Sequence, residues 1–291
     1  YGQGYALSVD PDGITVRGQG PGLFYGTRSL VQLIRKGRGG WMVPGMEIID
    51  WPDIRYRAAH YDTKHHQDKA GYVREFIRDL ADYKINILLW EWEDKFAYES
   101  HPEIGAPGAF TPDEMREFTR YARQYHIQIV PLVQGLGHVS YILKWPQYSH
   151  LREIAASNWE FCPLKDGTYD LLFDLWDEAI AATPGSEFIH LGTDETYELG
   201  QGVECGCREK ASEIGRYGLM QIFLERSAEH LRKQGRRVIS WGGEYRPGET
   251  IKPPEGLIVA EFSEDPDIAR TSRDAGYPAW VYDPNPGIEH L

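Results

Sequence analysis

The sequence FIHLGTDETYELG occupies residues 188–200 and is the most informative stretch of the chain. Its apolar run, Phe188 to Leu191, is typical of a buried strand, and Gly192 ends it just before two carboxylates, Asp194 and Glu195. Side chains of a strand alternate between its two faces, so two neighbours can address one site only where the strand ends. In parallel α/β proteins this edge is where ligands bind. We therefore predict that Asp194 and Glu195 are the carboxylates of a site.

Two adjacent carboxylates can divide chemical roles, because each raises the free-energy cost of ionising the other. One can then act as an acid while the other stabilises positive charge. The simpler alternative is an acidic pair that caps the next helix. Spacing alone leaves both interpretations open.

From Arg57 onward the pattern alternates between strands and helices, which indicates parallel strands. No glycine-rich dinucleotide turn follows the first strand, and this favours a (β/α)8 barrel of the TIM type over an open sheet. An eighth strand is missing from the pattern, so either it escapes recognition or the barrel is incomplete at the C-terminus. The predicted strands are 57–62, 85–90, 127–133, 187–192, 237–241, 257–262 and 278–282.

Three helices can be placed between these strands. Thr111-Pro112-Asp113-Glu114 is a capping box with proline at the first helical position, and it predicts a helix as far as Tyr125. Apolar side chains recur at helical spacing over 171–180 and over 220–231, and Gly235 closes the second of these helices.

The first 50 residues read as part of a small α+β domain. Asp10-Pro11-Asp12-Gly13 between two alternating runs indicates a hairpin, a helix is expected over 22–34, and another strand over 46–49. So few strands in a sheet that starts at residue 1 indicate a partial domain. The predicted organisation is a partial small domain over 1–50 and the barrel over 51–291.

Composition limits the possible partners. The net charge of −13 argues against nucleic acid and anionic membrane surfaces. No apolar run approaches the roughly 18 residues that span a bilayer. Most of the 9 Trp and 18 Tyr are expected in the core, but their surplus suits a site that stacks on rings. A soluble protein is expected, with the cytoplasm slightly favoured over secretion, and the oligomeric state is not fixed.

Metal signals in the sequence are weak. Cys205 and Cys207 form a Cys-x-Cys pair without a second pair, and small loop residues explain them more simply. His60, His65 and His66 could suggest a metal, but no carboxylate–histidine spacing on a helix accompanies them. No metal and no cofactor are expected.

Polar and aromatic side chains follow the predicted strands at their C-terminal ends. Taken singly, each has an ordinary explanation: His60 is more often a satisfied core histidine, and Trp241 more often packs. Together they supply acids that protonate and accept hydroxyl hydrogen bonds, and aromatic faces that cover a pyranose. In strand order they are His60, Asp62 and Lys64; Glu91, Glu93 and Asp94; Gln134 and His138; Asp194 and Glu195; Trp241 and Glu244; and Trp280 and Tyr282.

The block His190-x-Gly192-x-Asp194-Glu195 resembles the signature of family 20 glycoside hydrolases, the β-N-acetylhexosaminidases. Within that family the chain is most similar to the hexosaminidase D branch, and the likeness runs from about Leu23 to Trp241. The further blocks that carry it are His60-x-Asp62-x-Lys64, Glu91-x-Glu93-Asp94-x-Phe96-x-Tyr98-Glu99, Pro131-Leu132-Val133-Gln134-x-x-Gly137-His138 and Tyr197-x-Leu199-Gly200.

The resemblance implies a retaining exo-hydrolase of terminal β-linked GalNAc or GlcNAc that uses no enzyme nucleophile. Family 20 is among the substrate-assisted exceptions to the two-carboxylate scheme, in which the 2-acetamido oxygen attacks the anomeric carbon and gives an oxazolinium ion. By position, Glu195 would be the general acid and base, Asp194 would hold the acetamide N–H, and His138 would orient the pair. Trp241, Trp280 and Tyr282 would wall the acetamide pocket, and the substrate-binding set would also include His60, Asp62, Glu93, Gln134, Tyr197 and Glu244.

Some residues depart from the family pattern. Thr193 replaces a glycine common in the wider family, and Arg57 stands where many members read ring hydroxyls, a role that the hexosaminidase D branch does not require. Two other functions remain open: a metal-dependent barrel hydrolase built on the first-strand histidines, and a non-catalytic sugar-binding barrel. The Asp194–Glu195 pair argues against the second, and a chelator assay would test the first.

Overall fold

The computed structural model describes residues 2–242, 254–261 and 279–281. The chain folds into two compact units. The first holds the described residues of 1–61, 68–89 and 117–129, and the second holds those of 62–67, 90–116 and 130–291. The division into domains at 1–50 and 51–291 stays a prediction.

The first unit contains a three-stranded antiparallel sheet in the order β2-β1-β5. Its strands are β1 (Tyr5–Asp10), β2 (Gly13–Gly18) and β5 (Met46–Asp50). The predicted hairpin is confirmed: the Asp10 carboxylate accepts hydrogen bonds from the backbone N–H of Asp12 at 2.9 Å and of Gly13 at 3.0 Å. These bonds fix the turn because the aspartate side chain satisfies the turn's backbone donors.

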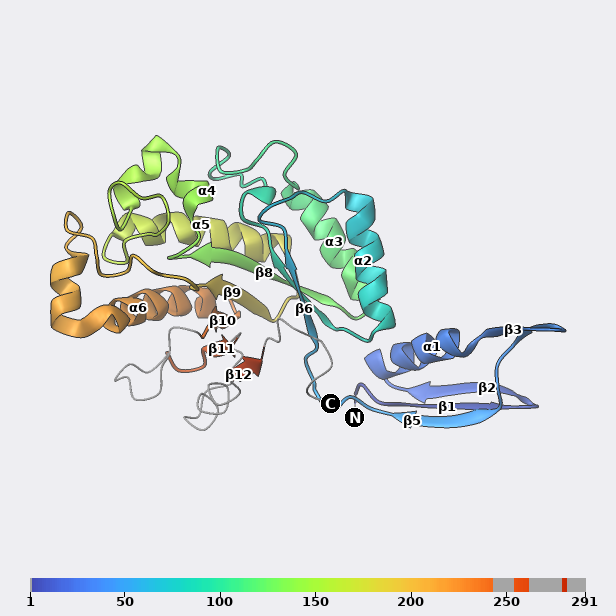
Figure 1. Ribbon diagram of the computed structural model, residues 1–291. Helices are drawn as coiled ribbons and strands as arrows, with labels where there is room; N and C mark the ends of the chain where they lie inside the picture. The colour runs from blue at the N-terminus through green and yellow to red at the C-terminus, as the bar shows by residue number, and fades with distance from the viewer. Residues whose placement is uncertain (1, 243–253, 262–278, 282–291) are drawn as a thin grey trace. The chain divides into compact units, whose positions relative to one another are not determined.

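Helix α1 (Pro21–Leu33) packs on this sheet, as Figure 1 shows. Two of its glycines allow the close approach. A Cβ on Gly22 would lie 2.1 Å from the Gly4 carbonyl oxygen, and one on Gly26 would lie 2.5 Å from Val16 Cγ1. The buried core between helix and sheet consists of Tyr5, Leu7, Val9 and Tyr25. A short hairpin of β3 (Arg35–Gly37) and β4 (Gly40–Met42) follows α1 and was not predicted.

The seven strands predicted from the alternating pattern are confirmed. They form one sheet in the order β12-β11-β10-β9-β8-β7-β6, and the pairs from β8 to β12 are parallel. No eighth strand joins the sheet within 2–242, 254–261 and 279–281. The bounds are β6 (Ala58–Asp62), β7 (Ile87–Glu91), β8 (Gln128–Gly135), β9 (Phe188–Gly192), β10 (Arg237–Trp241), β11 (Ile258–Glu261) and β12 (Ala279–Val281).

Every residue of β7 and of β9 is buried, as expected for parallel strands covered on both faces. Helices connect the strands, and Figure 1 shows α5 and α6 running alongside β8 to β10. None of the helices in the described part of the chain is long and apolar enough to cross a membrane. The helices are α2 (Ala70–Asp82), α3 (Pro112–Gln124), α4 (Ser140–Leu143), α5 (Asp166–Ala182) and α6 (Cys207–Lys233), with 3-10 turns η1 (Glu93–Lys95) and η2 (Pro146–Leu151).

The predicted capping box at α3 is confirmed. The Thr111 N–H donates to Glu114 Oε2 at 2.8 Å, and the Glu114 N–H donates to Thr111 Oγ1 at 3.3 Å. The two side chains thus satisfy donors that the first helical turn leaves unpaired.

Candidate active site

The candidate site lies where β7, β8 and β9 end. Leu132 pairs with His190 and Gly135 with Gly192, so β8 contains one residue more than β9 over the same length. This irregularity is a bulge, and bulges redirect side chains near sites. Strand β8 also ends later than predicted, at Gly135 instead of 133, so Gln134 lies inside the strand. Its side chain is fully buried and reaches the segment that follows β9.

Both predicted catalytic carboxylates contact one imidazole nitrogen. His138 Nε2 lies 3.1 Å from Asp194 Oδ2 and 3.1 Å from Glu195 Oε2. The Glu195 side chain is 44% exposed, whereas that of Asp194 is 16% exposed. The exposed carboxyl group is therefore open to a bound molecule, and the other is held within the protein.

A row of polar contacts, with the buried Gln134 and Glu91 at its centre, leads away from Asp194. The Gln134 side-chain amide donates to Asp194 Oδ1 at 3.0 Å and to Glu91 Oε1 at 2.7 Å. Lys64 Nζ lies 3.1 Å from Glu91 Oε1 and 3.2 Å from Asp62 Oδ2. Each carboxylate in this row has a donor or a cation as partner, which offsets the cost of burying Glu91 and most of Asp194.

These contacts shift the ionisation of the site. Burial opposes the charge on Asp194, but hydrogen bonds from His138 and Gln134 outweigh it and hold the pKa of Asp194 below its ordinary value. Burial also disfavours the charged form of His138, yet the hydrogen bond to Asp194 raises the pKa of His138. Asp194 is thus an anion at neutral pH, as a stabiliser of positive charge needs to be.

Glu93 is the third predicted acid at this edge. Burial and the nearby charge of Glu91 raise the pKa of Glu93 to about 8. A carboxyl group that is protonated near neutral pH can donate a hydrogen bond as well as accept one.

Backbone strain is concentrated at the same strand ends. Positive φ angles are uncommon for residues other than glycine, and they mark functional sites when the surrounding structure holds them. Of the seven such residues in the described chain, five flank the site: Glu93 (42°), Leu136 (86°), His138 (57°), Thr193 (76°) and Glu195 (51°).

Gly192 has two reasons to be glycine. Its φ is +70°, and a Cβ there would lie 1.7 Å from Gln134 Oε1 and 3.2 Å from Gln134 Cα. The glycine of the His-x-Gly-x-Asp-Glu block therefore makes room for the glutamine that holds Asp194.

We expect Gly192→Ala to lower kcat by more than its loss of folding free energy alone would cause. The left-handed backbone costs an alanine about 1–2 kcal/mol, and the new methyl group displaces the Gln134 amide from Glu91 and Asp194. Gly235→Ala is the matched control, because its φ is +76° with no atom within 4 Å of the added Cβ. Urea denaturation and kcat are measured for both variants. Equal losses of kcat in the two would show that the Gln134 contact has no part in the site.

Trp159 belongs to the site although the sequence did not single it out. Its indole Nε1 donates to the Glu195 carbonyl oxygen at 2.9 Å, and its ring centroid lies 4.5 Å from that of His138. Trp159 also stacks with Tyr197, a predicted binding residue that is exposed, at a centroid distance of 6.4 Å. Trp159 thus supports the backbone of Glu195 and forms an aromatic surface beside the carboxylates.

For the other predicted site residues that the structure describes, it shows the position on a strand. Trp241 ends β10, is buried, and lies 4.5 Å from the His190 ring between centroids. His60 lies on β6, two residues before Asp62 and therefore on the same strand face. Trp280 falls within β12, while Glu244 and Tyr282 lie outside the described residues.

The first-strand histidines do not assemble a metal site in the described part of the chain. Among the described residues, only one group of three or more His, Cys, Asp or Glu side chains lies close enough together to bind one metal ion. This group contains no histidine. That group is formed by Glu153, Cys162, Cys205 and Cys207.

Two family models cover the chain. "Glycosyl hydrolase family 20, catalytic domain" matches residues 54–285, and "Glycosyl hydrolase family 20, domain 2" matches residues 1–51. Hexosaminidase D from Bos taurus is 33% identical over 50% of this chain and 42% of its own length. This relative confirms the likeness to the hexosaminidase D branch.

Solved structures agree in fold. The chitobiase of Flavobacterium johnsoniae superposes with a TM-score of 0.85 at 23% identity, over 96% of this chain and 46% of that one. The N-acetyl-β-hexosaminidase of Streptomyces plicatus, in complex with Thio-NAglucal, gives a TM-score of 0.78 at 26% identity, over 96% of this chain and 59% of that one. The chain thus spans about half the length of the relatives it matches. Because the catalytic-domain model covers residues 54–285, the chain belongs to glycoside hydrolase family 20.

Proposed function

We propose that the protein is a retaining exo-β-N-acetylhexosaminidase that removes terminal β-linked GalNAc or GlcNAc by substrate-assisted catalysis. The observation that carries the proposal is the convergence of Asp194 and Glu195 on His138 Nε2, at 3.1 Å each. Two carboxyl groups on one side of a site suit an acid beside a charge stabiliser. The relatives named hexosaminidase D and N-acetyl-β-hexosaminidase support the same class of substrate.

In this mechanism Glu195 is the general acid. Its exposed carboxyl group would protonate the glycosidic oxygen and afterwards take a proton from the attacking water. The acetamide oxygen of the sugar would attack the anomeric carbon, so the leaving bond breaks as the oxazolinium ring closes. Water then opens this ring with retention of configuration.

Asp194 would bind the acetamide N–H. A carboxylate has about four lone-pair sites, and the His138 and Gln134 contacts use two of those on Asp194. The remaining sites can accept the N–H, and the anion stabilises the positive charge that develops on the acetamide. His138 and Gln134 position this carboxylate.

The other predicted residues would bind the sugar. Trp241 would wall the acetamide pocket with Trp280 and Tyr282, and polar groups would read the hydroxyls. The polar set comprises His60, Asp62, Glu93, Tyr197 and Glu244. This proposal includes a (β/α)8 barrel over 51–291 preceded by a partial small domain over 1–50.

We expect aryl β-GlcNAc and β-GalNAc glycosides to be hydrolysed and the matching β-glucoside hardly at all. A glucoside lacks the acetamide, which is the nucleophile in this mechanism. A thiazoline that mimics the oxazolinium should bind much more tightly than the product sugar, as analogues of reactive intermediates do. Initial rates on the three glycosides and an inhibition constant for the thiazoline are measured. Similar rates on β-glucoside and β-GlcNAc would contradict substrate assistance.

Preference between the two amino sugars rests on the hexosaminidase D likeness alone. That branch favours galactosaminides, so we expect the higher kcat/KM on the β-GalNAc glycoside. A clear preference for β-GlcNAc would overturn this part of the proposal and leave the mechanism intact.

A further inference from the structure

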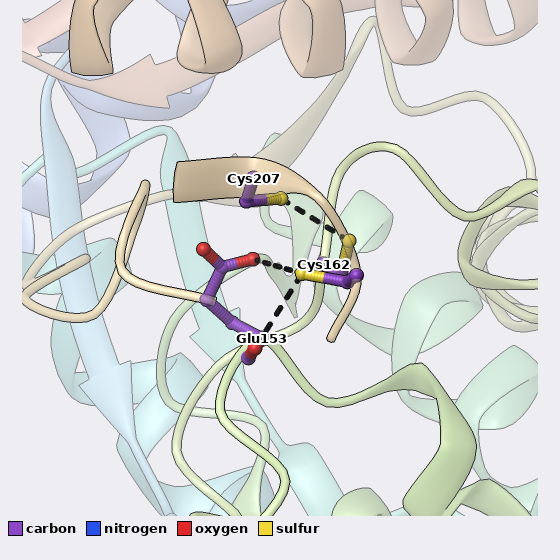
Figure 2. A group of neighbouring side chains, drawn as sticks. Glu153, Cys162 and Cys207 are labelled. Atoms are coloured by element: carbon purple, nitrogen blue, oxygen red, sulfur yellow. Dashed lines mark hydrogen bonds between the residues drawn. The ribbon is translucent and has the colours of Figure 1, made fainter. Parts of the chain in front are cut away.

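A second cluster of reactive side chains lies in the same unit and has no part in the proposed reaction. One carboxylate oxygen of Glu153 and the Sγ atoms of Cys162, Cys205 and Cys207 all lie within 4.8 Å of one another. Three of the residues are buried and Cys205 is half-buried. Figure 2 shows Glu153, Cys162 and Cys207 pointing into one common space from different segments of the chain.

The spacing of these atoms is close to that of a tetrahedral metal site. With Zn–S bonds of about 2.3 Å and Zn–O bonds of about 2.0–2.2 Å, ligand atoms lie roughly 3.5–3.8 Å apart. Cys162 Sγ lies 3.2 Å from Cys207 Sγ, and Cys205 Sγ lies 3.5 Å from Glu153 Oε2. All three cysteines are free thiols. Small side-chain adjustments would therefore bring four donors around one ion.

The carboxylate of the cluster is oriented by the backbone. Glu153 Oε1 accepts hydrogen bonds from the N–H of Gly200 at 2.9 Å and of Gly202 at 3.0 Å. This leaves Oε2 directed at the thiols. Ligating carboxylates usually have such hydrogen-bond partners on the oxygen that does not face the metal.

Glycines at and near the Cys205-Gly206-Cys207 turn allow its sulfur atoms to lie close to Glu153. Gly206 has φ of +81°, a conformation that favours glycine, and it separates Cys205 from Cys207, the first residue of α6. A Cβ on Gly202 would lie 2.4 Å from Cys205 Sγ and 2.3 Å from the Glu153 carbonyl oxygen. These glycines allow the carboxylate and the sulfur atoms to meet.

We propose that Glu153, Cys162, Cys205 and Cys207 bind one zinc ion. Three thiolates favour a soft or borderline metal, and a tetrahedral set of three sulfurs and one oxygen suits zinc. Four protein ligands fill the coordination sphere, so the ion supports the structure and takes no water into a reaction. Binding releases the thiol protons to solvent, and no ligand is oxidised or reduced.

The ion would fasten the segment that carries the acid pair. Glu160 Oε2, between Glu153 and Cys162 in the chain, accepts a hydrogen bond from the Glu198 N–H at 2.9 Å. Trp159 of the same loop donates to the Glu195 carbonyl oxygen. Residues 153–162 and the segment after β9 thus meet beside Glu195. The proposed zinc ligands come from the same two stretches: Glu153 and Cys162 from the first, Cys205 and Cys207 from the second. Loss of zinc should therefore lower the melting temperature and kcat together.

The test starts with the metal content of the purified chain. We expect about one zinc per chain by elemental analysis. Cobalt substitution should give a thiolate-to-metal charge-transfer band, and the three thiols should become reactive only after chelation. Glu153→Gln and Cys205→Ser should bind zinc at least about tenfold more weakly. Glu204→Gln, which alters an exposed acid beside Cys205, is the matched control and should keep the metal.

Several results would overturn the proposal. They are three freely reactive thiols with no metal in the wild-type chain, a Cys162–Cys207 disulfide with no metal, or unchanged zinc affinity in both ligand variants. The wild-type measurement decides the question even where a variant fails to fold. Because metal content and the cobalt spectrum do not depend on turnover, this test can fail or succeed independently of the proposed hydrolase activity.

Discussion

Glu195→Gln should lower kcat/KM on substrates with poor leaving groups by roughly 10²–10⁴-fold, the usual contribution of a general acid. The glutamine keeps the size of the side chain and a polar group in the place of the carboxylate that lies 3.1 Å from His138 Nε2, but it has no acidic proton to give to the glycosidic oxygen. A dinitrophenyl leaving group needs no protonation, so kcat/KM on that glycoside should change little. The measurement is a series of aryl glycosides with leaving groups of different pKa, compared between wild type and variant.

Glu198→Gln is the matched control for this series. Glu198 lies in the same segment, three residues further on, and has no role in the proposed mechanism. We expect its kcat/KM to stay near the wild-type value on every leaving group. If Glu195→Gln hydrolysed a natural disaccharide as fast as wild type, or lost equal activity on all leaving groups, Glu195 would not be the acid.

The strands could be predicted from the sequence because buried parallel strands consist of short apolar runs. Phe188–Leu191 is such a run, and the structure places all of it in the buried strand β9. Boundaries were less predictable where tertiary contacts decide them. Strand β8 continues to Gly135, two residues beyond the predicted end, because its pairing with β9 resumes there after an irregularity. Local pattern contains no signal for such a bulge.

The site could be predicted only where its residues follow strands. Asp194, Glu195, Gln134 and His138 all do, and the structure brings these four together. Trp159 escaped prediction because it lies in an irregular loop and meets Glu195 across 36 residues of sequence.

The cysteine cluster escaped prediction for the same reason. Spacing relates Cys205 to Cys207, but Cys162 joins them from 45 residues before Cys207, and Glu153 from further still. An isolated Cys-x-Cys pair contains no information about ligands that the fold supplies from elsewhere. The expectation that no metal binds was drawn from that pair and from the histidines alone, and the proposed zinc site replaces it.

Asp194→Asn should lower kcat by roughly 10²-fold or more, as loss of other transition-state electrostatic partners does. Asparagine keeps a hydrogen-bonding group near Gln134 and His138 but removes the negative charge that would stabilise the oxazolinium. The charge is needed most in the transition state, so KM should change much less than kcat.

The same variant should change the titration of His138. Asp194 is the main group that raises the pKa of His138, while burial and Lys64 lower it and Glu195 raises it less. Removing the anion should therefore lower the His138 pKa, and an NMR titration of the imidazole in both proteins would measure the shift. An unchanged pKa would mean that the contact between His138 and Asp194 is absent in solution.

A covalent trap separates this mechanism from double displacement, in which the second carboxylate attacks the anomeric carbon and forms an ester. Asp194 is next to Glu195 in the chain, both face the same His138 nitrogen, and its proposed partner is the acetamide N–H. After incubation with a 2-fluoro glycoside, mass spectrometry should therefore find no sugar attached to any peptide of the enzyme. A sugar ester mapped by fragmentation to the Asp194 carboxylate, and not to the adjacent Glu195, would make Asp194 the nucleophile, and the substrate-assisted mechanism would then be wrong.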